Sequence, residues 1–358
     1  MESKIIQLSA IDPVVINNIP EYTEEKVRGK AYVNYGKNNL YPQYLWDLYG
    51  KVASMQAIIN GTVDFICGND ARFNVKGFET VVNKKGETAN DLVRKLAFDY
   101  MIFGGFAFQV IRNLEGGIAE IYPLDFMKVR SDEKNEIFYY CEDWSKWGAK
   151  AKIYPKFGTD DSNPTSVFYY KGSVTRGVYP TPLYGAALVA CELEKAINEF
   201  HLNNINNGFA SNLIINFNNG QPNEEQKKEI ERDVTEKFSG YQNAGRILLS
   251  FNDSDENATK VERLDGDDFD DKYSALAERS REQIFVAFRA TPNLFGFPNQ
   301  TTGFNEQEYE SSFKLYNRTV VRPIQNVLVD AFDKVFGQKG SMTIAPFTLE
   351  GNVENSVN

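Results

Sequence analysis

The sequence predicts an α+β fold, in which helical segments flank a region of antiparallel strands. On either side of residues 105–172, apolar residues recur every three or four positions, as amphipathic helices require. Within residues 105–172 apolar and polar residues instead alternate, and Gly- or Asn-containing turns separate the runs. The chain has 358 residues, of which 42% are hydrophobic and 25% charged, as expected for a folded protein.

The N-terminal part is expected to form an irregular segment and then three helices. Residues 1–40 are polar and show no helical or strand period. Residues 41–68 predict two helical pieces, with Gly68 as the C-cap. Thr88 and Asp91 have the spacing of a capping box before a third helix. The apolar face of this third helix consists of Leu92, Leu96, Tyr100 and Phe103.

Strands are expected after the glycine pair Gly104-Gly105. GFAFQVIRN and IAEIYPL predict a hairpin around the turn LEGG. FMKVRSD and IFYYCEDW predict a second hairpin around DEKN, and AKIYPKF and SVFYYKG add two more strands. The region is therefore predicted to be largely antiparallel.

A helix, a small polar excursion and a second helix are expected next. Residues 222–238 predict a short, highly charged helix, with Asn223 as its N-cap and Gln226 completing a capping box. The runs NLIINF and RILLSF flank this helix and are strand-like. Residues 183–207 and 268–289 predict the two longer helices. Their apolar stripes consist of Ala186, Val189, Leu193, Ala196 and Phe200 in the first and Phe269, Tyr273, Leu276, Ile284 and Phe288 in the second.

A long helix is predicted over residues 305–336. Asn305 and Glu308 have capping-box spacing, and Pro323 is expected to kink the helix. The tail SMTIAPFTLEGN predicts one more strand and a frayed end.

The sequence carries no positive evidence for an enzyme. The single histidine, His201, lies on a predicted helix without a second metal ligand four residues on, and no phosphate-binding loop motif occurs. Cys67, Cys141 and Cys191 are far apart and do not predict a disulfide framework. No cofactor or metal is therefore expected.

Two acidic clusters are candidates for binding a metal ion. Residues 253–257 resemble the start of a calcium loop, but Ala258 stands at the glycine position and Leu264 at the position of the bidentate glutamate. The second cluster crowds the start of a helix, where carboxylates complement the helix dipole. A metal-dependent hydrolase or nuclease that uses this cluster is one alternative function. The cluster comprises Asp265, Asp267, Asp268, Asp270 and Asp271.

Charge and hydropathy restrict the possible partners. The net charge is −10, whereas a protein that grips DNA by neutralising phosphates is usually basic. The N-terminus lacks the apolar run of a signal peptide. The most apolar stretch, YMIFGGFAFQVI, is too short to cross a bilayer, so no membrane partner is expected.

Four motifs follow one another along the chain. They are LAFDYMIFGGFAFQVIRNLEGGIAEIYPLDFMKVR, YPTPLYGAALVACELEKAINEFHLNNINNGFASNLIIN, FSGYQNAGRILLSF and AERSREQIFVAFRATPNLFGF. In this order and spacing, the motifs resemble the portal proteins of tailed bacteriophages, in particular those of long-tailed phages. Members of that family form the ring at one capsid vertex.

The resemblance implies a portal fold with an α/β wing, a two-helix stem, a small α/β clip and a long kinked wing helix, whose crown is short or absent. The implied boundaries are residues 1–182 for the wing, 183–207 for the first stem helix, 208–264 for the clip, 265–290 for the second stem helix, 291–304 for the tunnel loop and 305–358 for the long wing helix with the C-terminal strand and tail.

The resemblance also implies a structural role without catalysis. About twelve copies would close into a ring that conducts double-stranded DNA during packaging and ejection. The other implied partners are the terminase, a head-completion adaptor and the major capsid protein. The implied location is the virion and, during assembly, the host cytoplasm.

Two groups of residues are candidates for contacts with these partners. The uncharged segment before Asn305 is expected to line the tunnel and to touch DNA through weak hydrogen bonds, without ion pairs that would hold the strand. The polar side of the charged helix is expected to dock partner proteins. The tunnel residues are Asn299, Gln300, Thr301 and Thr302, and the docking residues are Lys227, Lys228, Glu231 and Arg232.

The small excursion at residues 208–264 gives a physical reason for a ring. It contains few positions to bury and would hardly be stable alone. Identical neighbours in a closed ring would cover its apolar positions. The remaining alternative to a portal is another ring-forming phage protein, of the head–tail connector or the baseplate.

Overall fold

Contacts within the chain divide it into two units. Unit 1 consists of Met1–Ile19 and Glu192–Ser280, and unit 2 consists of Pro20–Cys191 and Arg281–Asn358. Both units contain helices and strands, so the predicted α+β class is confirmed. The computed structural model describes residues 5–8, 20, 22–146, 148, 150–160, 162–172, 176–206, 213–217, 223, 225–230, 232, 247–251, 267–297 and 306–348.

Unit 2 begins with the short antiparallel pair β2 (Glu24–Glu25) and β3 (Asn34–Tyr35), and three helices follow, as predicted. They are α1 (Tyr41–Lys51), α2 (Ala53–Cys67) and α3 (Ala89–Phe103), and Gly68 caps α2 with a φ of 63°. The capping box before α3 is also present. The N–H of Asp91 donates to Thr88 Oγ1 (3.2 Å), and the N–H of Thr88 donates to Asp91 Oδ2 (2.9 Å). The expected apolar face of α3 is buried.

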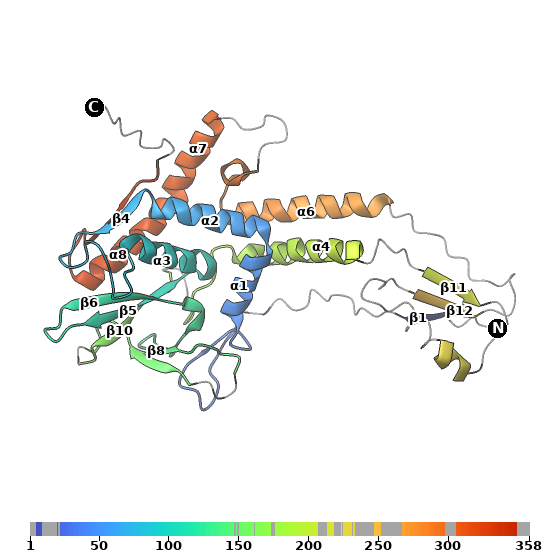
Figure 1. The fold of residues 1–358 in the computed structure, drawn as a ribbon, viewed down its shortest axis with the longest axis horizontal. Helices are drawn as coiled ribbons and strands as arrows, with labels where there is room; N and C mark the ends of the chain where they lie inside the picture. The colour runs from blue at the N-terminus through green and yellow to red at the C-terminus, as the bar shows by residue number, and fades with distance from the viewer. Residues whose placement is uncertain are drawn as a thin grey trace. The chain divides into compact units, whose positions relative to one another are not determined.

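Two antiparallel sheets follow and confirm the predicted hairpins. The first has the order β10-β5-β6, with β5 at Phe106–Arg112, β6 at Ile118–Leu124 and β10 at Thr165–Tyr170. The second has the order β7-β8-β9, at Val129–Ser131, Ile137–Tyr140 and Lys152–Pro155. Figure 1 shows α3 beside the first sheet, which it contacts through β5 and β6.

The glycine pair between α3 and β5 is required by close backbone contacts. Gly104 has a φ of +79°, and a Cβ atom there would lie 2.2 Å from the carbonyl oxygen of Thr181. A Cβ atom on Gly105 would lie 2.5 Å from the carbonyl oxygen of Tyr170. Only glycine lets the segment before α4 pack directly on this turn.

The predicted long helix is interrupted next to Pro323. It consists of α7 (Glu306–Tyr316), a π-helical turn (Asn317–Val321) and α8 (Arg322–Phe336), while Asn305 lies outside the described residues. Proline has no N–H to donate, and its ring clashes with the carbonyl four residues earlier. The wider π turn accommodates this, since the N–H of Arg322 donates to the carbonyl of Asn317, five residues back.

The predicted C-terminal strand is present and pairs with a strand that the sequence did not reveal. Strand β13 (Met342–Ala345) is antiparallel to β4 (Asp70–Phe73), which directly follows α2. Aromatic rings in contact, one pair stacked and one edge to face, join this part of unit 2 to the first sheet. The ring centroid of Phe332 lies 5.0 Å from that of Phe108 on β5 and 5.0 Å from that of Phe73 on β4.

A buried arginine ties the segment before α1 to the second sheet. Arg130 on β7 is fully buried. Its Nε donates to Asn39 Oδ1 and its Nη2 to the Asn39 carbonyl, both at 2.6 Å, while Nη1 donates to the carbonyls of Val129 (2.7 Å) and Met127 (3.0 Å). Among the described residues no carboxylate pairs with this guanidinium, and burial lowers the pKa of Arg130 to about 10.

Two tyrosines extend this network to the segment that precedes α4. The ring of Tyr179 stacks on that of Tyr35 at a centroid distance of 4.2 Å. The hydroxyl of Tyr179 donates to the Val33 carbonyl and accepts from the N–H of Ser131 (3.0 Å). The hydroxyl of Tyr35 donates to the Pro180 carbonyl (2.6 Å). Residues far apart in the sequence are thus joined through satisfied buried polar groups.

Unit 1 contains a three-stranded sheet with the order β1-β12-β11. Strands β11 (Leu213–Phe217) and β12 (Ile247–Phe251) are parallel and match the two predicted strand-like runs. Strand β1 (Ile5–Leu8) pairs antiparallel with β12, so the prediction that residues 1–40 are irregular is wrong there. This pairing depends on a partner more than 200 residues away in the sequence, which local pattern does not reveal.

The two longer predicted helices are present, and both cross the boundary between the units. They are α4 (Leu188–Asn206), which follows a short 3-10 turn at Gly185–Ala187, and α6 (Asp267–Ala287). Within unit 1, Phe200 on α4 stacks on Tyr273 on α6 at 4.8 Å. The three cysteines are all described, are buried and form no disulfide. No helix in the described ranges has the length and apolar character needed to cross a bilayer.

The Arg130 network predicts a large difference between two arginine-to-methionine variants. Arg130→Met removes the guanidinium donors from four acceptors, of which Asn39 Oδ1 keeps the N–H of Tyr35 and the Met127 carbonyl keeps Gln43 Nε2. We expect the free energy of unfolding to fall by ~3 kcal/mol or more. Arg94→Met removes a half-exposed ion pair with Asp64 (2.6 Å) and is expected to cost under ~1 kcal/mol. Equilibrium urea denaturation followed by circular dichroism measures both values. Equal losses would contradict the anchoring role of Arg130.

Candidate functional site

The four candidate tunnel residues, Asn299 to Thr302, lie outside the described residues, so their contacts stay predictions. The start of the same loop is described, and Pro292–Phe295 form a short 3-10 helix there. Proline suits the first position of a helix because its φ is fixed near the helical value and its missing N–H is not needed there.

Aromatic side chains fix this start of the loop within unit 2. Leu294 is buried, and the ring of Phe295 lies 5.4 Å from that of Tyr316 and 6.2 Å from that of Phe65. Phe297 packs on Phe285 at a ring distance of 5.5 Å. The first residues of the loop are therefore held in place by packing, and the candidate residues follow them in the sequence.

The candidate docking helix begins as predicted. The N–H of Gln226 donates to Asn223 Oδ1 (2.8 Å), and the N–H of Asn223 donates to Gln226 Oε1 (3.1 Å), which completes the capping box. Of the four docking candidates, Lys228 and Arg232 are exposed, and Lys227 is half-buried. Glu231 lies outside the described residues. Arg232 is 3.7 Å from Glu229 in an exposed ion pair.

The acidic clusters gain no support as metal sites. Residues 253–257 and Asp265 lie outside the described residues. Asp267, Asp268, Asp270 and Asp271 fall in the first turns of α6. Within the part of the chain that is described, no three His, Cys, Asp or Glu side chains are grouped to hold a metal ion. His201 is exposed on α4, near the rings of Phe200 and Tyr273.

Helix α4 carries apolar side chains on more than one side. Its buried residues are Ala190, Cys191 and Ile197. The apolar stripe predicted from the sequence is a different set, and it leaves Val189 at 53% and Phe200 at 40% of full exposure. Leu202 on α4 and Val286 on α6 are also exposed, at 58% and 76%. Exposed apolar side chains gathered on a helix indicate a surface that another molecule covers.

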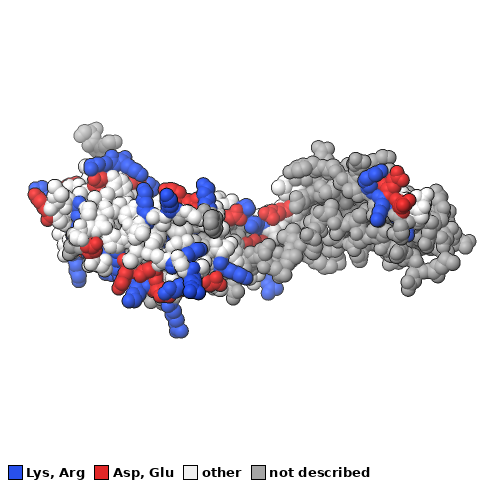
Figure 2. Space-filling model, turned by 90° about the horizontal axis from the view of Figure 1, so that it is seen from below, with Lys and Arg blue, Asp and Glu red and all other residues white. Residues whose placement is uncertain are grey.

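Charged side chains do not form a basic surface for nucleic acid on the face that Figure 2 shows. In the described part of unit 2, lysine and arginine side chains alternate there with aspartate and glutamate. The ion pairs of unit 2 include Lys84 with Glu120 (2.9 Å) and Lys314 with Glu310 (2.9 Å). Such a surface would give DNA little counterion-release energy.

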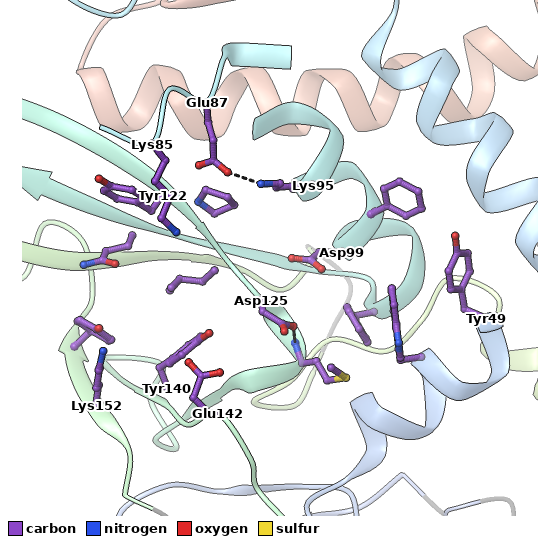
Figure 3. Close-up of a pocket in the computed structure, with 18 residues that line it drawn as sticks. Tyr49, Lys85, Glu87, Lys95, Asp99, Tyr122, Asp125, Tyr140, Glu142 and Lys152 are labelled. Atoms are coloured by element: carbon purple, nitrogen blue, oxygen red, sulfur yellow. Dashed lines mark hydrogen bonds and ion pairs between the residues drawn. The ribbon is translucent and has the colours of Figure 1, made fainter. Parts of the chain in front are cut away.

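A cavity of about 690 Å³ lies in unit 2 between α1, α3 and the two sheets (Figure 3). Aromatic rings and charged groups line it together, including Asp99 of α3 and Asp125, which directly follows β6. Sequence analysis did not identify this site. The available signal was Asp99 itself, a carboxylate in the otherwise apolar run LAFDYMIF.

Solved structures with similar folds come from virus-like particles. The neck of an empty gene transfer agent (GTA) particle, computed with C6 symmetry, gives a TM-score of 0.55 at 15% identity, over 85% of this chain and 84% of that chain. The neck of the native GTA particle, computed with C12 symmetry, gives 0.54 at 17% identity, over 87% and 86%. At this identity the likeness shows a shared fold.

Sequence comparisons give one partial relative and one family. An uncharacterized protein of Rickettsia felis is 30% identical over 124 residues, which span 35% of this chain and 30% of that protein's length. The family model described as phage portal protein matches residues 81–351. This match covers well over half of the sequence and confirms the resemblance on which the sequence analysis relied, so the chain belongs to the phage portal protein family.

Proposed function

We propose that copies of this chain close into a ring at one capsid vertex, through which double-stranded DNA is packaged and later ejected. The family match over residues 81–351 carries this proposal and supports a role as a portal connector. The exposed apolar side chains of α4 support ring formation, because a second copy of the chain would bury them. The GTA neck, solved with C12 symmetry, supports a ring of about twelve subunits.

The proposed regions follow the implied boundaries, with one change. Helices α4 and α6 are assigned to the stem, β11, the charged helix and β12 to the clip, and α7 with α8 to the long wing helix. Residues 1–19 were expected to belong to the wing. They group instead with unit 1, and β1 pairs with β12, so we assign β1 to the clip sheet and begin the wing at Pro20.

The proposed role of the ring is structural. An acidic chain whose charges are interspersed would let a phosphate backbone slide without holding it. The proposed partners are DNA, the terminase and head-completion adaptor at the clip, and the major capsid protein. The proposed location is the portal vertex of the virion and, during assembly, the host cytoplasm. No observation on the described residues favours the hydrolase alternative.

Ring formation predicts that a charge on the exposed stripe of α4 blocks assembly. Val189→Glu places a carboxylate where a neighbouring subunit would otherwise bury an apolar group, at a cost of ~2 kcal/mol or more for each interface. We expect size-exclusion chromatography with light scattering to show a loss of rings. Val81→Glu, at a valine of unit 2 that is 42% exposed, is the matched control and should assemble normally. Normal rings with Val189→Glu would refute the assigned interface.

The docking assignment predicts a partner defect without an assembly defect. Lys228→Glu combined with Arg232→Glu reverses two exposed charges on the clip helix, and we expect weaker terminase binding while rings still form. Lys76→Glu combined with Lys339→Glu makes the same charge change on exposed residues of unit 2 as a control. Unchanged terminase binding to rings of the first variant would show that the clip helix is merely solvated.

The tunnel assignment predicts slower DNA movement when charge is added to the loop. Gln300→Lys combined with Thr301→Lys would add two phosphate contacts and hold the strand, so we expect intact rings but slowed or stalled packaging. Gln300→Asn combined with Thr301→Ser is the neutral control at the same positions. If the lysine variant packages and ejects DNA at the normal rate, this loop does not line the narrowest part of the channel.

A further inference from the structure

One wall of the cavity in unit 2 is an aromatic surface that reaches solvent. The rings of Trp46 and Tyr49, both on α1, are 5.2 Å apart, and Phe98 on α3 meets Tyr49 edge to face at 6.1 Å. Trp46 remains 48% exposed although it is a large apolar side chain. Exposed tryptophan beside a cavity is typical of a surface that binds another molecule.

Two carboxylates lie in the middle of the cavity. Figure 3 shows Asp99 and Asp125 facing the same space, between Tyr49 on one side and Lys85, Tyr122 and Lys152 on the other. Asp99 accepts a hydrogen bond from the N–H of Phe126. Asp125 accepts one from the N–H of Met127 (3.1 Å) and caps the short 3-10 turn that follows β6.

Lys95 and Lys128, two of the nearby lysines, are paired with glutamates. Lys95 pairs with Glu87, and Lys128 pairs with Glu142 at 2.7 Å and lies 3.5 Å from Asp125. The ammonium of Lys85 lies 5.7 Å from the ring centre of Tyr122. Among the described residues, none of these cations forms an ion pair with Asp99.

The environment of Asp99 is unfavourable for its charge. Burial, and the neighbouring charge of Asp125, raise the pKa of the Asp99 carboxyl well above its usual range. A group held in this way destabilises the empty protein, and such groups are found at binding sites more often than elsewhere. A cation placed between the two carboxylates would stabilise the ionised form of Asp99 and so oppose both causes of the shift.

We propose that this cavity docks an arginine side chain carried by an extended segment of a partner protein. A guanidinium presents five N–H donors in a planar fork, enough to donate to both carboxylates. The same group stacks on aromatic faces such as those of Trp46 and Tyr49. A cavity of about 690 Å³ is larger than one side chain and leaves room for the residues that flank the arginine. Two carboxylates in its centre disfavour nucleic acid as the occupant.

The test uses two peptides that differ in charge but hardly in shape. Acetyl-Ala-Gly-Arg-Gly-Ala-amide is titrated into the full-length protein by isothermal calorimetry, alongside the peptide in which citrulline replaces arginine. We expect the arginine peptide to bind at least about tenfold more tightly, because citrulline keeps the shape and loses the charge-assisted hydrogen bonds. Equal affinities, or no binding of the arginine peptide, would overturn the proposal.

Three variants test whether the arginine peptide binds in this cavity. Asp99→Asn is expected to weaken arginine-peptide binding by about tenfold or more without lowering the thermal denaturation midpoint. Trp46→Ala, at a half-exposed position, should also weaken it, since the ring no longer covers the guanidinium. Glu115→Gln removes a carboxylate from the exposed β5–β6 turn and is the matched control, with unchanged binding expected. Unchanged binding in the Asp99 and Trp46 variants would overturn the proposal.

A competition experiment with spermidine distinguishes a polypeptide from a small amine as the occupant of the cavity. Spermidine carries the charge without a flanking backbone, so we expect it to bind more weakly than the arginine peptide and to be displaced by it. Spermidine binding that depends on Asp99 and equals or exceeds the affinity of the peptide would overturn the assignment to a partner protein. Portal rings and DNA packaging play no part in this readout, so its outcome is independent of the proposed function.

Discussion

The buried guanidinium of Arg130 is the interaction on which the arrangement of unit 2 depends. It donates four hydrogen bonds, to the amide oxygen and carbonyl of Asn39 before α1, to the carbonyl of Met127 and to that of Val129 on β7. Tyr35 and Tyr179 continue this network to the segment before α4. That segment also packs on Gly104 and Gly105, where any larger residue would collide with backbone. The start of α4 is thereby fixed to the sheets of the same unit.

Helix α4 begins in this fixed part of unit 2 and bears apolar side chains that the proposed ring would cover. A helix with apolar residues on more than one side cannot bury all of them against its own chain, and Val189, Phe200 and Leu202 stay exposed. An oligomer resolves this, since in a closed head-to-tail ring every copy is covered by its neighbours and no interface is left open. The small sheet of unit 1 faces the same constraint, as three short strands supply little core of their own.

Two ionisable side chains of unit 2, Arg130 and Asp99, differ in how their surroundings treat their charge. Arg130 is surrounded by acceptors from the same chain, so its burial is compensated within the fold. Asp99 is partly exposed in the cavity, accepts from a backbone amide and faces a second carboxylate, so its ionised form is not compensated to the same degree. The first residue is an internal anchor, and the second is poised for a cation from outside.

The sequence by itself determined the elements whose signals are local. These signals are the hydrophobic period, the caps at Thr88 and Asn223, and the glycine turn of the β5–β6 hairpin. Each depends on residues only a few positions apart, so the sequence is enough to locate it. The family could also be identified, because the order of its motifs is a property of the chain.

Tertiary structure decided what depends on distant residues. Strands β1 and β4 exist because each finds a partner more than 200 residues away, and neither has a strong pattern of its own. The hydrophobic period located the apolar stripe on α4 but did not show that the stripe is exposed to solvent. A period shows which residues share one face of a helix, but not whether another element covers that face. The carboxylate pair at Asp99 and Asp125 arises where α3 meets the end of β6, a junction that only the packed sheet creates.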